Sequence, residues 1–271
     1  MNLPAILSVL GLACYSALFY VVVSSPLHTR GKVRRFFLGS LLVMVAWQLS
    51  ALIVSLAKNE GLAIAGYQVM STIVVAFGVS YALFVRTFLM IRDNRGMILG
   101  SSVLCIGTLL LILVARPSVI AGVYWNTTTQ FYLPRFGPLA PVVGVPYYLL
   151  LGYVVLLLLR GYRQAQEPLV RSRIQYLLLG WCVLLTGTLA NFVPSLKVYP
   201  IDLMANVINA VLIAYAIFRY QLLDISLVIR KGLVYTIPTT IIGIVYFLTV
   251  FVVERLLRIS IGYQVFLLSL L

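Results

Sequence analysis

The chain has 271 residues, of which 62% are hydrophobic and 10% are charged, and its 20 Lys and Arg residues outnumber 6 Asp and Glu residues to give a net charge of +14. About 25% of the residues of a typical soluble domain are charged, so this composition excludes a soluble globular protein. The positive charge does not indicate a nucleic-acid partner, because the basic residues lie in short loops between apolar stretches instead of on one face.

Seven uncharged apolar stretches follow one another along the chain. Most are long enough to cross ~30 Å of hydrocarbon as helices, and lipid offers no hydrogen-bond partner to a backbone that is not helical. We therefore expect an all-α, polytopic membrane helix bundle with seven spans, an eighth, and a ninth that is truncated at Leu271. The predicted spans are Leu3–Ser25, Phe36–Ala57, Gly61–Val85, Met97–Ala115, Phe136–Leu159, Ile174–Leu196 and Leu203–Phe218, followed by Gly232–Val253 and a segment from Ile259.

The loops between these spans differ in charge. Fourteen of the 20 Lys and Arg residues lie in the loops of one side and the other six in the loops of the opposite side. Loops rich in Lys and Arg stay in the cytoplasm. We therefore expect a multi-pass protein of the bacterial inner (plasma) membrane with its N-terminus outside.

One external connection, from Arg116 to Arg135, is much longer than the others. Its run of threonines with flanking aromatic residues predicts a β-hairpin that lies over the external mouth of the bundle. Aromatic residues such as Trp125 suit the membrane–water boundary, and a long ordered loop can also act as a ligand lid. The sequence leaves both roles open.

Soluble-type enzyme motifs are absent from the sequence. The three cysteines lie inside apolar spans, the single histidine, His28, lies in the first cytoplasmic loop, and all six acidic residues lie at span ends or in loops. We therefore predict no catalytic residue, no metal site and no cofactor. Kinase activity would require an output domain beyond Leu271.

Uncharged polar residues within the spans are the candidates for a ligand site. Asn206 and Asn209 are three residues apart and share a helix face, and Asn191, Tyr199 and Asp202 lie at the same external end. Such groups face protein instead of lipid, where they either pack through interhelical hydrogen bonds or line a polar pocket. The predicted ligand-binding residues are Trp125, Asn191, Tyr199, Asn206 and Asn209.

The run from Phe218 to Tyr235 reads FRYQLLDISLVIRKGLVY. Its apolar residues can lie against the membrane while its charged residues face water or headgroups. This run resembles the segment that closes the seven-transmembrane N-terminal sensor region of bacterial membrane histidine kinases. The resemblance implies a seven-helix sensor region (1–219), an interfacial coupling segment (220–233) and further spans (234–271) that end before any output domain. It also makes Arg219, Asp224, Arg230 and Lys231 candidates for signal coupling, although Arg230 and Lys231 could instead only anchor helix ends.

The resulting functional hypothesis is the sensory input region of a two-component signal-transduction protein. The expected partners are the lipid bilayer, a small ligand or membrane stimulus, a cytoplasmic signalling domain in the same chain or on another, and a second copy in a homodimer, with no nucleic acid. A small-solute transporter is the alternative hypothesis, and a membrane-embedded enzyme is the third.

Overall fold

The structure is a computed structural model that describes residues 2–24, 31–91, 95–127, 129–193, 196 and 198–222. The predicted spans from Gly232 onwards and the predicted coupling residues Asp224, Arg230 and Lys231 lie outside the described residues. His28 lies outside them as well.

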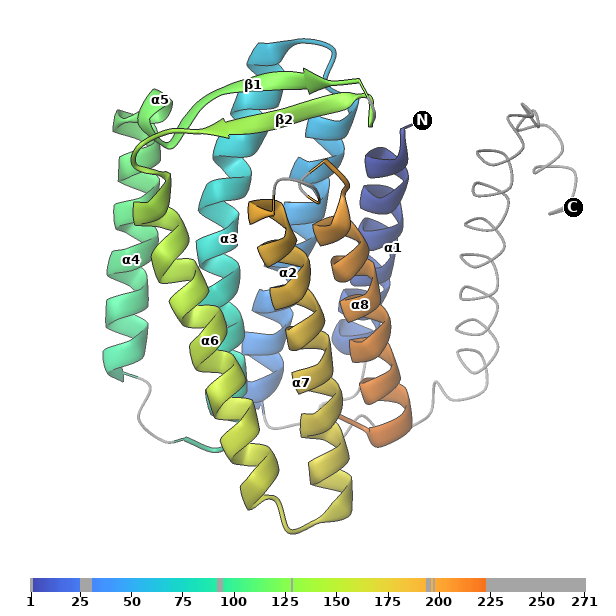
Figure 1. Cartoon of the computed structure of the whole chain (residues 1–271). Helices are drawn as coiled ribbons and strands as arrows, with labels where there is room; N and C mark the ends of the chain where they lie inside the picture. The colour runs from blue at the N-terminus through green and yellow to red at the C-terminus, as the bar shows by residue number, and fades with distance from the viewer. Residues whose placement is uncertain are drawn as a thin grey trace, which may run out of the picture. The chain divides into compact units, whose positions relative to one another are not determined.

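Long helices make up most of the described chain (Figure 1). They are α1 (Leu3–Ser24), α2 (Gly31–Leu56), α3 (Glu60–Phe88), α4 (Arg95–Val114), α6 (Ala140–Gln164), α7 (Pro168–Leu189) and α8 (Ile201–Tyr220), with a short α5 (Arg116–Val119) and a 3₁₀ turn, η1 (Ala190–Phe192). Six of the long helices are apolar enough over sufficient length to cross a membrane, and α4 contributes a shorter apolar stretch, Ser102–Ile112. The predicted helical membrane bundle is confirmed, and the number of spans stays a prediction.

Several helix ends differ from the predicted spans, and α6 and α7 show the physical reasons. The fifth span was expected from Phe136, but α6 begins at Ala140, because Phe136 pairs with Ile120 in a sheet. The sixth span was expected over Ile174–Leu196, whereas α7 begins at Pro168, whose fixed φ suits the first turn of a helix. At its other end α7 stops at Leu189 and tightens into η1, so Asn191 lies in a 3₁₀ turn beyond the α-helix.

Long helices that follow one another in the sequence run in opposite directions across the bundle (Figure 1). The strongest packing joins α1 to α2, α2 to α3 and α7 to α8, while α1 also packs on α8 and α3 on α6. The core between them is rich in aromatic side chains. Trp181 is completely buried, stacks on Tyr81 with ring centroids 4.1 Å apart, and donates its indole N–H to the Leu151 carbonyl oxygen at 3.0 Å. These contacts hold α3, α6 and α7 in one packed unit.

The predicted β-hairpin is confirmed. Strands β1 (Ile120–Asn126) and β2 (Phe131–Phe136) pair antiparallel with Tyr124 opposite Leu133. The hairpin lies across the end of the bundle at which α1 begins (Figure 1). Two side chains fix it there: the Tyr67 hydroxyl donates to the Tyr132 carbonyl oxygen at 2.7 Å, and the Asn2 amide donates to the Gln130 carbonyl oxygen at 2.7 Å.

Candidate functional site

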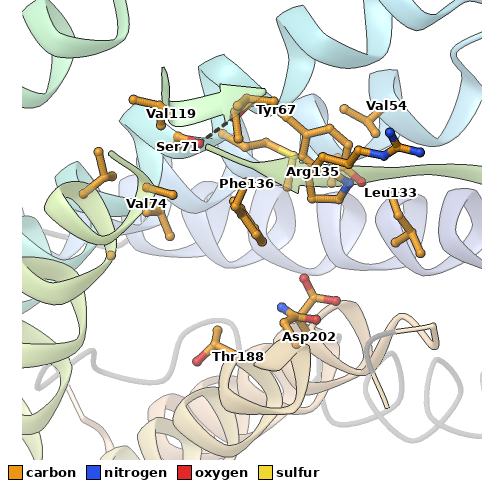
Figure 2. Close-up of a pocket in the computed structure, with 18 of the residues that line it drawn as sticks. Val54, Tyr67, Ser71, Val74, Val119, Leu133, Arg135, Phe136, Thr188 and Asp202 are labelled. Atoms are coloured by element: carbon orange, nitrogen blue, oxygen red, sulfur yellow. Dashed lines mark hydrogen bonds between the residues drawn. The ribbon is translucent and has the colours of Figure 1, made fainter. Parts of the chain in front are cut away.

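A cavity of about 820 Å³ lies between the hairpin and the helix ends beneath it. Figure 2 shows how the surrounding elements contribute to it. Leu133, Arg135 and Phe136 of β2 lie on the opposite side of the cavity from Thr188 of α7 and Asp202 of α8. Its volume falls within the range of sites that bind small molecules, about 300–1,000 Å³.

Most of the cavity wall is apolar. The α2 and α3 side contributes Trp47, Val54 and Val74, and the segment before and within β1 contributes Val119 and Ile120. Ser71 also lines this side, but its hydroxyl donates to the backbone oxygen of Tyr67 at 2.8 Å within its own helix (Figure 2). This part of the wall can therefore contact an apolar group of a ligand and presents few free hydrogen-bonding groups.

Aromatic rings form a second part of the wall. Tyr147 and Tyr148 of α6 contact each other edge-to-face with centroids 5.2 Å apart, and Tyr148 makes a similar contact with Phe192 of η1 at 5.5 Å. The Tyr148 hydroxyl donates to the Thr188 carbonyl oxygen at 3.4 Å. The ring cluster therefore joins α6 to the end of α7 at the cavity.

Asp202 brings a carboxylate to this surface. It lies in the first turn of α8 and lines the cavity, where Asn191 donates a side-chain hydrogen bond to its carboxylate. The backbone N–H groups of Asp202 and Leu203 also donate to it. The N-terminus of a helix carries a partial positive charge that favours a carboxylate in the first turn, so the carboxylate is held in a defined position.

Arg135 supplies the opposite charge at the hairpin. Its side chain is exposed, and its guanidinium lies over the Tyr124 ring at 5.6 Å from the centroid. No ion pair joins Asp202 to a Lys or Arg side chain of the described residues. The same described residues contain no group of three or more His, Cys, Asp or Glu side chains that could hold a metal ion.

The structure brings two of the five predicted ligand-binding residues, Asn191 and Tyr199, to the cavity. Trp125 does not line it: 49% of this residue is exposed, and its ring contacts Tyr132 edge-to-face at 5.1 Å. The remaining two, Asn206 and Asn209, lie within the bundle and do not line the cavity either.

The prediction that Asn206 and Asn209 face the bundle interior is confirmed, since they are 4% and 1% exposed. The Asn206 amide donates to the Asp202 carbonyl oxygen at 2.7 Å, and the Asn209 amide donates to the Tyr15 hydroxyl at 2.9 Å. That hydroxyl in turn donates to the Asn206 carbonyl oxygen at 3.0 Å. The two bonds of the Tyr15 hydroxyl join α1 to α8, which is the packing role that the sequence left open.

Several cavity residues were not predicted. The sequence marks Tyr67, Tyr147 and Tyr148 only as aromatic residues within apolar spans. It marks Arg135 only as one of the basic residues of an external loop. Asp202 was recognised only as a neighbour of the candidate residues. The adjacent tyrosines after Pro146 are the one local pattern that could have drawn attention to this part of α6.

No curated protein matches the chain. A family model described as the N-terminal 7TM region of histidine kinase matches residues 6–226. This match covers most of the chain, including the hairpin and nearly the whole of the described helices. The chain therefore belongs to the family of N-terminal seven-transmembrane regions of histidine kinases.

Proposed function

We propose that the chain is the sensory input region of a bacterial two-component signalling protein and that its stimulus binds in the cavity beneath the hairpin. Family membership supports a membrane sensory role. The rest of the proposal rests on the position of α8. This helix begins at the cavity, which Asp202 lines, and its other end at Tyr220 leads into the coupling segment. A change in the cavity can thus act directly on the helix that leads out of the sensor region.

The far end of α8 is tied to α7. The Arg173 guanidinium Nε–H donates to the Tyr220 carbonyl oxygen at 2.7 Å, and the Tyr176 ring stacks on Tyr220 with centroids 5.1 Å apart. Both helices also reach the cavity, through Thr188 and Asp202. We infer that α7 and α8 respond to the stimulus as a pair, because they pack closely on each other and are joined at the end far from the cavity.

The coupling segment begins directly after this pair. Arg219 is exposed in the last turn of α8, and we propose that it acts with Asp224, Arg230 and Lys231 to pass the change to a cytoplasmic signalling domain in the same chain or on another. A sensor of this kind needs two helix packings that differ in their affinity for the stimulus. We further propose an N-terminus outside the inner membrane and a homodimer as the signalling unit.

Filling the cavity tests this function. Gly144 of α6 lines the cavity, and a Cβ added to it would meet no atom within 4 Å, so Gly144→Phe adds a ring at the cavity wall without a clash at its Cβ. Gly152 of the same helix is equally free of close neighbours but does not line the cavity, which makes Gly152→Phe the matched control.

Both variants are placed in the full-length protein with its native output module, and autophosphorylation is measured in membranes at equal protein abundance. We expect Gly144→Phe to shift the basal output at least threefold, in either direction, and Gly152→Phe to leave it unchanged. Wild-type output from both variants would contradict a signalling role for the cavity.

A further inference from the structure

We propose that the cavity binds an organic monocation, an ammonium group on an apolar aliphatic or aromatic body, with the Asp202 carboxylate as its counter-ion. The inference rests on the proposed function, because it names the chemical class of the stimulus for the same cavity. It is carried by the placement of one carboxylate, a set of aromatic rings and an apolar wall around a single space.

The carboxylate is prepared for a cation. Asn191 and the backbone N–H groups of Asp202 and Leu203 donate hydrogen bonds to the carboxylate, the start of α8 favours its negative charge, and a bound cation would offset the cost of burying that charge. Among the described residues no Lys or Arg side chain forms an ion pair with it. A bound ammonium would therefore supply a charge partner without displacing one, and a preorganised partner loses little entropy on binding.

Three tyrosine side chains of the cavity wall lie near this carboxylate. Tyr67 of α3 and Tyr147 and Tyr148 of α6 all lie close enough to Asp202 to interact with it electrostatically. The faces of such rings attract cations, most strongly where water is excluded. Carboxylate and rings together favour an ammonium group over a neutral group of the same shape.

The rest of the cavity determines the body of the ligand. Its wall contains Val74, Val119 and Leu133, and its volume of about 820 Å³ exceeds the space that an ammonium group alone would fill. Arg135 lies on the hairpin side, opposite Asp202 (Figure 2). A second positive charge on the ligand would be repelled there, so the arrangement favours a single charge at the Asp202 end and an apolar group towards the hairpin.

The test uses the full chain reconstituted into phosphatidylcholine nanodiscs, with empty nanodiscs to correct for partition into lipid. The probes are 3-phenylpropyltrimethylammonium, its neutral analogue with carbon in place of nitrogen, 4-phenylbutyrate, and N,N,N-trimethylphenylalanine as a zwitterion. Tryptophan emission reports binding, because Trp47 lines the cavity. We expect the cation to bind at least tenfold more tightly than each of the other three probes.

Four variants locate the cause of this preference. Asp202→Asn should reduce the preference for the cation over the neutral analogue to threefold or less, and Asp202→Glu, which keeps the charge, should retain most of it. Glu60→Gln removes the exposed carboxylate in the first turn of α3 and should change nothing. Lys197→Gln tests whether this lysine, five residues earlier in the sequence, neutralises Asp202 in place of the ligand. Binding of the cation should be unchanged in this variant.

Several outcomes overturn the inference. The neutral analogue could bind as tightly as the cation, or the preference for the cation could survive Asp202→Asn. Phenylbutyrate or the zwitterion could bind more tightly than the cation and lose that affinity in Arg135→Gln. Finally, no probe could bind. None of them decides the proposed function, because the output of Gly144→Phe against Gly152→Phe is measured without a ligand. A failed cation test beside a shifted Gly144→Phe output would leave the sensor cavity in place and change only the chemistry of its ligand.

Discussion

Gly187 is a point at which α7 and α8 approach each other very closely beside the cavity, and we predict that Gly187→Ala destabilises the protein. A Cβ at position 187 would lie 2.3 Å from the Cβ of Ala205. Carbon atoms in contact are about 3.5–4.0 Å apart, so the two helices must separate locally by about 1.2 Å or more. Neither Cβ can rotate away, because each is fixed to its backbone.

The magnitude follows from two opposing terms. Overpacking of a well-packed interior costs about 1–3 kcal/mol, whereas Ala is favoured over Gly in a helix by about 1 kcal/mol. Because neither Cβ can move away, the overpacking cost falls in the upper part of this range, about 2–3 kcal/mol, and we expect a net loss of about 1–2 kcal/mol in the free energy of unfolding. Gly152→Ala is the control, because position 152 has no neighbour within 4 Å and shows only the helix-propensity term. It should be neutral or stabilise the protein by up to about 1 kcal/mol.

A double variant tests the stated contact. With Ala205→Gly added, the new Cβ at position 187 meets the Ile201 carbonyl oxygen at 3.4 Å and the Asp202 Cα at 3.5 Å, which the packing tolerates with little movement. The exchange also keeps one Ala and one Gly in the two helices, so stability should return to within about 0.5 kcal/mol of wild type. The assay is SDS-titrated unfolding in mixed micelles followed by tryptophan emission. A Gly187→Ala variant as stable as wild type, or a double variant no better than Gly187→Ala, would refute this account of the α7–α8 contact.

Three further predictions concern other parts of the chain. Gln48 is completely buried, and neither the oxygen nor the nitrogen of its amide has a hydrogen-bond partner among the described residues. Gln48→Leu should therefore raise the free energy of unfolding by about 1–3 kcal/mol in the same assay. A lower free energy of unfolding would show that the amide has a partner in the membrane. In a cysteine-free background, Lys58→Cys at the hairpin end should react with an impermeant maleimide in intact cells and Gln166→Cys only after permeabilisation, and the reverse pattern would invert the topology. In the full-length protein, Asp224→Asn should shift basal output without altering insertion, since a carboxylate is of little use as an anchor beside anionic lipid; a wild-type dose–response curve at wild-type abundance would remove Asp224 from the coupling path.

The sequence by itself determined the features that depend on short stretches of chain. Span length and the absence of charge predicted a helical membrane bundle, because lipid leaves an apolar backbone no other way to satisfy its hydrogen bonds. The threonines and aromatic residues between Trp125 and Tyr132 predicted the hairpin, and the three-residue spacing of Asn206 and Asn209 predicted their common buried face. The span limits at Phe136 and Leu196 were wrong, because hydropathy alone does not separate a helix from an apolar strand or turn at its end.

Only the tertiary structure decided which residues form the cavity. Tyr67, Tyr147 and Asp202 come from three helices far apart in the sequence, and nothing local indicates that they share one space. In a membrane the lipid-facing and core-facing sides of a helix are both apolar, so sequence periodicity gives little information on how each helix is rotated. Rotation depends on close contacts such as Gly187 against Ala205 and on buried hydrogen bonds such as Tyr15 to Asn206. Those contacts direct Asp202 to the cavity and Asn209 to the helix interface, although both lie on the same helix, α8.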